Sequence, residues 1–245
     1  MTEANHQESP TLHPLYQQVR RMLVDRLASG DWSPGELLPS EAALAQLYGV
    51  SQGTIRKALD TMAAERLVVR HQGRGTEVAK HDSERSLFQF WHLYGEDGTR
   101  QIPSSKVINC VRTSARAGEA RLLSIKRGAP VIRITRCRFI NDQPVIIEWI
   151  TLPAERFPGI ESYDKDLPNT LYSLYQKHYR VTIQTAVEKL RAVTADRQDA
   201  EPLGIKTGTP LLEIERVALD LEDEPVELRI SRCDTQSLHY RNVLD

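Results

Sequence analysis

Two arginines and a glutamate interrupt apolar runs in the second half of the chain. In residues 131–140, Arg136 and Arg138 share one face with isoleucines, because successive side chains of a strand alternate between faces. Glu148 interrupts the next apolar run, 145–152, in the same way. Burying such charges is costly unless they are paired. Adjacent guanidinium groups suit phosphate or carboxylate oxygens. Either these side chains pair with one another or they surround a polar ligand.

A second polar group lies in the first third of the chain, on a predicted helix. Its apolar face is formed by residues at i, i+3, i+4 and i+7, which are Ile55, Ala58, Leu59 and Met62. The opposite face and the N-terminal turn carry Ser51, Gln52, Gly53, Thr54, Arg56, Lys57 and Asp60. In helix-turn-helix proteins, this end of the second helix approaches base edges and phosphates, and a glutamine amide can bind adenine. An ordinary packed helix pair with a solvated polar face is the alternative.

A glycine-rich turn follows this helix. Residues 67–70 and 76–78 read as short strands, and Gly73, Arg74 and Gly75 form the tip between them. A long cationic side chain on such a tip can enter the minor groove, where negative potential is concentrated. A solvated hairpin arginine is the alternative.

The elements that position these residues can be read from caps and periodicity. Ser40 is placed to cap a short helix with Leu44 and Leu47 on its inner side, Gly49 ends it, and Ser51 caps the next helix. A further helix, over residues 15–27, precedes this pair. The whole pattern predicts a winged helix-turn-helix.

The rest of the chain contains an internal repeat. Residues 120–136 and 200–216 share eight identities in seventeen positions. Each copy reads as a short helix, a Gly-x-Pro turn, a strand, a turn ending in Pro-Val and a second strand. A duplicated unit of this kind predicts one antiparallel sheet with helices on a face.

Composition predicts a soluble cytoplasmic protein. The chain has 245 residues, with a polar N-terminus and no run long enough to span a membrane. Its three cysteines are scattered, so reduced thiols are expected and no metal site or cofactor is predicted. Residues 51–80 hold six basic and three acidic residues, a net of +3. DNA affinity should therefore fall with salt.

The N-terminal third resembles the DNA-binding domain of GntR-family bacterial transcription regulators. The residues that carry this resemblance are LPSEAALAQLYGVSQGTIRKAL and RHQGRGTEVA. It implies contacts to double-stranded DNA from Ser40, Glu41, Ser51, Gln52, Gly53, Thr54, Arg56, Lys57, Gly73, Arg74 and Gly75. The family often has Arg-Glu where this chain has Ala42 and Ala43, and Ser-Arg-x-Thr where it has Ser-Gln-Gly-Thr, so we expect a different operator preference.

Residues 88–240 resemble the UTRA domain of the HutC-type branch, whose fold is similar to that of chorismate lyase. The matching motifs are PSSKV from Pro103, Arg-Cys-Arg at 136–138, Pro-Val at 144–145 with Glu148, Thr-Leu-Tyr at 170–172 and Pro-Val-Glu at 225–227. The resemblance implies an anion cradle formed by Ser104, Ser105, Arg136, Arg138, Thr170 and Tyr172. It also implies that Glu148 and Glu227 read hydroxyl or amine groups. Cys233, where relatives often have tyrosine, and the aromatic stretch 88–91 argue against a simple amino-sugar phosphate and leave a carboxylate or aromatic-bearing effector open.

These observations predict an α+β protein with a winged helix-turn-helix domain and a C-terminal antiparallel-sheet domain with flanking helices. The predicted boundaries are a disordered N-terminus at 1–9, the DNA-binding domain at 10–79, a linker at 80–87 and the effector-binding and dimerisation domain at 88–245. The predicted function is a ligand-responsive transcriptional repressor. As a homodimer it would bind a palindromic operator, and a phosphate, phosphonate or carboxylate metabolite would release it.

Two other functions stay open at this point. The second domain could be an enzyme with a chorismate lyase-like fold, although no catalytic constellation stands out. Alternatively, the chain could be a constitutive DNA-binding protein whose second domain only dimerises.

Overall fold

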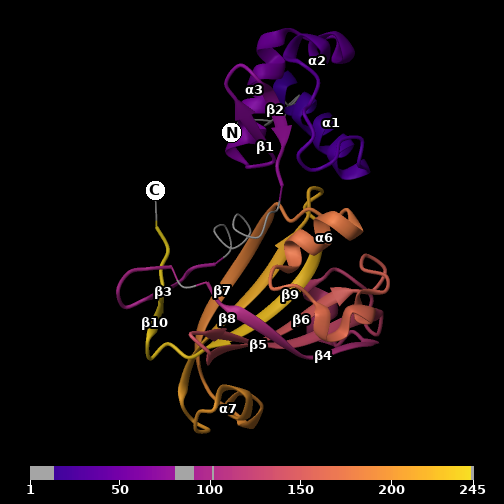
Figure 1. Cartoon of the computed structure of the whole chain (residues 1–245). Helices are drawn as coiled ribbons and strands as arrows, with labels where there is room; N and C mark the ends of the chain where they lie inside the picture. Colours follow the sequence, from indigo (N-terminus) through magenta and orange to yellow (C-terminus); the bar gives the residue numbers. More distant parts are fainter. Residues whose placement is uncertain (1–13, 81–90, 101, 244–245) are drawn as a thin grey trace, which may run out of the picture. The chain divides into compact units, whose positions relative to one another are not determined.

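The chain folds as two compact units that divide between Ala79 and Lys80 (Figure 1). The computed structural model describes residues 14–80, 91–100 and 102–243. The predicted disordered N-terminus and nearly all of the predicted linker therefore lie outside the described residues, as do residues 88–90 of the aromatic stretch. None of the helices within the described ranges has the length and apolar character needed to cross a membrane.

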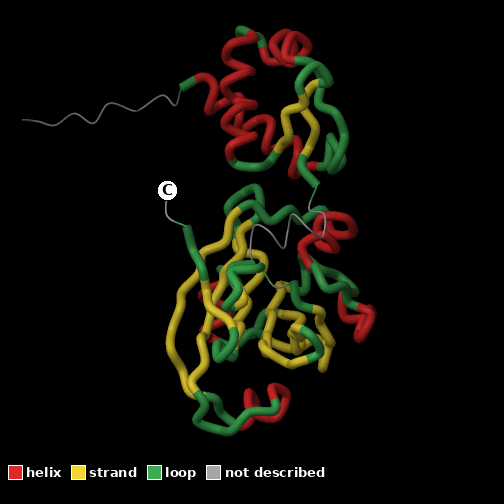
Figure 2. The backbone as a smooth tube through the Cα atoms, turned by 60° about the vertical axis from the view of Figure 1, so that its left-hand side comes forward, coloured by secondary structure: helices red, strands yellow, loops and turns green. Residues whose placement is uncertain are grey.

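In the described part of the N-terminal unit, residues 14–79, three helices are followed by a β-hairpin (Figure 2). The bounds of these elements are α1 Leu15–Ser29, α2 Glu41–Tyr48, α3 Gln52–Ala64, β1 Val68–His71 and β2 Gly75–Val78. The predicted caps are confirmed: the Ser40 hydroxyl accepts from the Ala43 N–H at 3.2 Å, and Ser51 accepts from the Thr54 N–H at 3.1 Å. Gly49 has a φ of 65°, the left-handed conformation that ends α2. The predicted winged helix-turn-helix is confirmed.

The core of this unit is the apolar face predicted for α3, packed against α1 and α2. All four predicted residues of that face are buried. The prediction for Leu47 is wrong, because 58% of its surface is exposed. In α2 the buried pair is Leu44 and Ala45. At about 100° per residue, Leu47 lies about 110° from the centre of that pair and so points to solvent.

The C-terminal unit is built on a six-stranded antiparallel sheet in the order β4-β5-β6-β9-β8-β7. The strand bounds are β4 Ser104–Ser114, β5 Pro130–Ile140, β6 Gln143–Pro153, β7 Thr185–Thr194, β8 Pro210–Leu219 and β9 Pro225–Cys233. A second, two-stranded sheet pairs β3 Leu93–Gly95 with β10 Leu238–Tyr240. The helical elements are α5 Ala117–Leu122, η1 Ile160–Asp166, α6 Leu171–Tyr179 and α7 Arg197–Leu203.

The internal repeat is visible as two copies of one unit. The series β4-α5-β5-β6 recurs as β7-α7-β8-β9, and the two copies join through β6 and β9 in the middle of the sheet. The structure thus confirms the predicted helix and strand pair and adds one preceding strand to each copy. Gly128 and Gly208 occupy equivalent turns and both have positive φ, which only glycine adopts readily.

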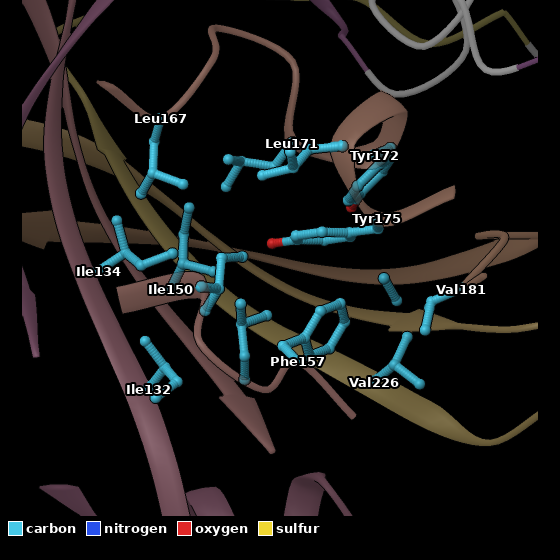
Figure 3. Close-up of a cluster of buried hydrophobic side chains, with 14 of the residues drawn as sticks. Ile132, Ile134, Ile150, Phe157, Leu167, Leu171, Tyr172, Tyr175, Val181 and Val226 are labelled. Atoms are coloured by element: carbon cyan, nitrogen blue, oxygen red, sulfur yellow. The ribbon is translucent and has the colours of Figure 1, made fainter. Parts of the chain in front are cut away.

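The two faces of the main sheet have different covers. Helix α6 and η1 pack on one face over a large apolar cluster, in which Tyr172 and Tyr175 lie side by side above strand isoleucines (Figure 3). The small β3–β10 sheet packs on residues of the same face, through Leu93 and Leu238. Helices α5 and α7 cover the opposite face. The candidate site lies on the face that α6 covers.

Candidate effector site and DNA-binding surface

Strand register brings the charged residues of three strands onto one face of the main sheet. Arg136 pairs with Glu148, and Glu148 pairs with Ser231 on β9. Directly paired residues of an antiparallel sheet point to the same face. Arg138 lies two residues from Arg136, and Arg229 two residues from Ser231, so both share that face.

Arg136 and Arg138 both form ion pairs with Glu148. The Arg136 Nε donates to Glu148 Oε2, and Arg138 Nη1 lies 3.5 Å from the same oxygen. Asn169, just before α6, holds the other ends of both guanidinium groups. Its backbone oxygen accepts from Arg136 Nη1 at 3.2 Å, and its side-chain Oδ1 accepts from Arg138 Nη2 at 3.1 Å. These charges therefore pair with one another, as one of the alternatives from the sequence required.

A second set of contacts continues the cluster on β9. Arg229 donates to both oxygens of Glu227 at 2.9 Å and lies 3.6 Å from Glu148. The hydroxyls of Tyr172 and Tyr175 donate to the same Glu227 carboxylate at 3.1 and 2.8 Å. Both oxygens of Glu227 are therefore engaged by groups of the chain itself.

The cluster contains more positive than negative charge. Arg136, Arg138 and Arg229 face Glu148 and Glu227, which leaves a net of +1. All five side chains are at most 9% exposed. A half-buried ion pair nearby, between Arg216 on β8 and Glu188 on β7, is neutral and leaves this excess unchanged.

The pKa values of the cluster reflect this imbalance. Burial, reinforced by the neighbouring Arg136, lowers the pKa of the Arg138 guanidinium to about 9, so it stays cationic at neutral pH. Burial alone would raise the pKa of Glu148, but Arg136, Arg138 and Arg229 together outweigh it and hold that pKa well below its usual range. Among the described residues, Arg138 Nε has no hydrogen-bond partner.

The remaining predicted cradle residues differ in burial and in the face of the sheet on which they lie. Thr170 precedes α6 and is half-buried, and its side chain does not cap the helix. Ser105 is half-buried and pairs with Arg138 across the strands. Ser104 is exposed, and strand alternation turns it to the opposite face from Ser105. The structure therefore brings Ser105, and not Ser104, onto the face that carries the arginines.

Sequence reasoning missed three members of the cluster. Arg229 lies two residues after Glu227, so the alternation argument used for β5 could have found it. Tyr175 lies three residues after Tyr172 on α6, so helical spacing could have placed both tyrosines on one face. Asn169 directly precedes the Thr-Leu-Tyr motif, and nothing in its local pattern marks it as a partner of buried charges. The Asn169 Nδ2 also donates to Pro103 O at 2.8 Å, which ties the start of β4 to the cluster.

The predicted DNA-contacting residues lie at the start of α2, on the first turns of α3 and on the hairpin tip of the N-terminal unit. Apart from the half-buried Thr54, those from Ser51 to Lys57 are exposed, as are the three tip residues. Gly73 and Gly75 have φ values of 73° and 102°, so the turn that presents Arg74 depends on glycine.

Glu41 forms ion pairs with two arginines on this surface. Its carboxylate accepts from Arg56 at 2.8 Å and from Arg70 at 2.6 Å, and Arg70 also contacts Asp60 at 2.5 Å. Hydrogen bonds from Arg56 and then Arg70 lower the pKa of Glu41. Sequence reasoning missed Arg70, which connects β1 to both helices of the motif.

Fold and site together define a class of protein, in which a winged helix-turn-helix unit is followed by a sheet domain that encloses arginines and carboxylates. Residues 15–78 match the family of bacterial regulatory proteins called gntR, and residues 99–239 match the UTRA domain. The chain belongs to the GntR family and carries a UTRA domain, as both resemblances implied. Members of this family are transcriptional regulators that bind DNA and sense small molecules through the UTRA domain.

Individual relatives agree with this assignment. The chain is 30% identical over 221 residues to the probable fructoselysine utilization operon transcriptional repressor of Escherichia coli K12, covering 89% of this chain and 90% of the relative. It is 31% identical over 205 residues to the transcriptional repressor NagR of Bacillus subtilis, covering 83% of each. The ligand-binding domain of a GntR-family regulator from Bordetella bronchiseptica superposes with a TM-score of 0.61 at 32% identity, covering 64% of this chain and 98% of that one. The protein is therefore a transcriptional regulator and not an enzyme.

Proposed function

We propose that this protein is a repressor that binds a palindromic operator as a homodimer and is released by a small metabolite carrying an oxyanion group. The observation that carries the effector class is the net +1 charge of the buried cluster formed by Arg136, Arg138, Arg229, Glu148 and Glu227. A buried cation that has no compensating charge among the described residues is costly, and a phosphate, phosphonate or carboxylate would neutralise it.

The start of α6 adds to the attraction for an anion at the same place. Asn169, the residue before Thr170, already contacts both strand arginines. The first N–H groups of a helix carry partial positive charge and bind oxyanions. A phosphate or phosphonate placed here would meet the helix start and the guanidinium groups together.

The DNA-binding step uses α3 and the hairpin of each protomer. Two copies related by a two-fold axis would place their α3 helices about one helical turn of DNA apart. Gln52 is proposed as a base-reading residue and Arg74 as a minor-groove contact. Because DNA lies in the cytoplasm of a bacterium, we propose that the protein acts there.

Release of the operator follows from linkage. The effector can shift the protein toward a geometry that does not fit the operator only if it binds that geometry more tightly. Operator DNA must then weaken effector binding by the same factor.

The test is a thermal-unfolding screen of phosphates, phosphonates and carboxylates against the full chain and two variants. Arg136→Ala removes a member of the cluster. Arg133→Ala, on the same strand but facing the opposite way and paired with Glu119, is the matched control. We expect a stabilising compound to act on the wild type and on Arg133→Ala but not on Arg136→Ala, and to lower operator affinity in fluorescence anisotropy. If no oxyanion stabilises the wild type, the second domain would serve dimerisation alone.

A further inference from the structure

Beside the arginine cluster, two buried N–H donors on stacked side chains lack an acceptor among the described residues. They are Trp91 Nε1 and Arg138 Nε, and neither has a hydrogen-bond partner among the described residues. The Arg138 guanidinium carbon lies 5.1 Å from the centre of the Trp91 ring. Trp91 is 8% and Arg138 2% exposed, so neither donor is satisfied by bulk water.

Trp91 packs on the sheet face that carries the cluster. Its ring belongs to an apolar cluster with Ile146, Ile214 and Cys233. Register places Arg138, Ile146 and Cys233 in one row across three strands. Cys233 is a small side chain at the end of this row, which leaves room for the indole against the sheet.

Leaving a buried donor without an acceptor costs about 1–3 kcal/mol, and more when the group is charged. The other N–H groups of Arg138 are engaged, since Nη1 faces Glu148 and Nη2 donates to Asn169. Among the described residues, the Nε edge is thus the side of this guanidinium that has no acceptor. The Trp91 indole, which lies against this guanidinium, carries the second donor without an acceptor.

We propose that Trp91 is an effector-binding residue, whose indole N–H donates, together with Arg138 Nε, to the oxyanion group of the ligand. This inference rests on the proposed effector site. It adds to that site an aromatic side chain and the hydrogen-bond donor that this side chain carries. Both N–H atoms are enclosed in the described conformation, so an incoming oxyanion reaches them only when the Trp91 ring swings aside. The ring then closes over the bound group, which makes it a reporter of occupancy.

The test compares Trp91→Phe with Trp149→Phe in the full chain, using inorganic phosphate and methylphosphonate as probes. Trp91→Phe keeps an aromatic ring and removes the N–H. Trp149 lies on the opposite face of the sheet beside Arg232 and is the matched control. We expect Trp91→Phe without ligand to unfold at the wild-type temperature or above it, because an unsatisfied donor is removed. Its affinity for the probe should fall about tenfold, as for loss of one hydrogen bond to a charged group.

Tryptophan fluorescence gives a second readout that a structural role would not change. The probe should alter the emission of the wild type and of Trp149→Phe but not that of Trp91→Phe. Unchanged probe affinity in Trp91→Phe, with binding still abolished by Arg136→Ala, would overturn this inference alone. If neither the wild type nor Trp149→Phe binds an oxyanion, the proposed effector site fails and this inference fails with it.

Discussion

Replacing Asn169 with aspartate would place a negative charge where the effector's charge is proposed to lie. The Asn169 Oδ1 is 3.1 Å from Arg138 Nη2, and the two side chains are already in hydrogen-bonding geometry. The substitution changes one amide into a carboxylate with little change in volume. It therefore brings the net charge of the cluster from +1 to zero without adding a ligand.

The expected gain in the free energy of unfolding is the difference between an electrostatic attraction and two costs. Two unit charges about 3 Å apart attract by about 5 kcal/mol at an effective dielectric constant of about 20. Desolvation of the half-buried carboxylate and loss of the 2.8 Å hydrogen bond to Pro103 O offset most of this attraction. We expect a net stabilisation of about 1–2 kcal/mol, which raises Tm by about 2–8 °C for a folded unit of this size. Affinity for phosphate should fall at least about tenfold, because the excess charge is already neutralised.

The assay is thermal unfolding and phosphate titration of Asn169→Asp beside two controls. Asn169→Ala removes the side-chain contacts without adding charge and should lower Tm. Asn109→Asp makes the same charge change at an exposed position of β4 and should leave both Tm and phosphate affinity unchanged. A lower Tm for Asn169→Asp with undiminished phosphate affinity would refute the reasoning that excess positive charge attracts the effector.

Four further outcomes are expected. Gln52→Ala should relax sequence preference at one operator position by about 1–3 kcal/mol in a selection experiment; an unchanged selected sequence would rule out base reading by Gln52. Glu41→Gln should tighten non-specific DNA binding and steepen the slope of log K against log salt by about one, whereas a constant slope would show that its arginines do not reach phosphates. Tyr175→Phe should lower the free energy of unfolding by about 1.5–3 kcal/mol through loss of the bond to a buried carboxylate, and Tyr179→Phe on the same helix should change it much less. Because the pKa of Glu148 is lowered on folding, its stabilising contribution is present at neutral pH and is lost as the pH falls below about 4.5; urea unfolding should show this decline, and a flat profile down to pH 3.5 would contradict it.

The amino-acid sequence determined the local elements and their order. Periodicity marked the buried face of α3, and the capping residues Ser40, Ser51 and Gly49 marked the helix ends to within a residue or two. The identities between 120–136 and 200–216 revealed the duplicated unit. Alternation alone placed Arg136 and Arg138 on one face, because side-chain direction in a strand depends only on the parity of the position.

Tertiary structure decided which residues pair with the buried charges. Glu148 meets Ser231 through β6–β9 pairing, and Asn169 reaches the arginines of β5 from the start of α6. These contacts join residues far apart in the chain, so no local pattern encodes them. The exposure of Leu47 has the same cause, because the orientation of α2 against α1 and α3, and not its own periodicity, selects which side is buried. Residue types thus defined what each segment could do. Long-range pairing decided which charges meet, and among the described residues it leaves the cluster with one positive charge in excess.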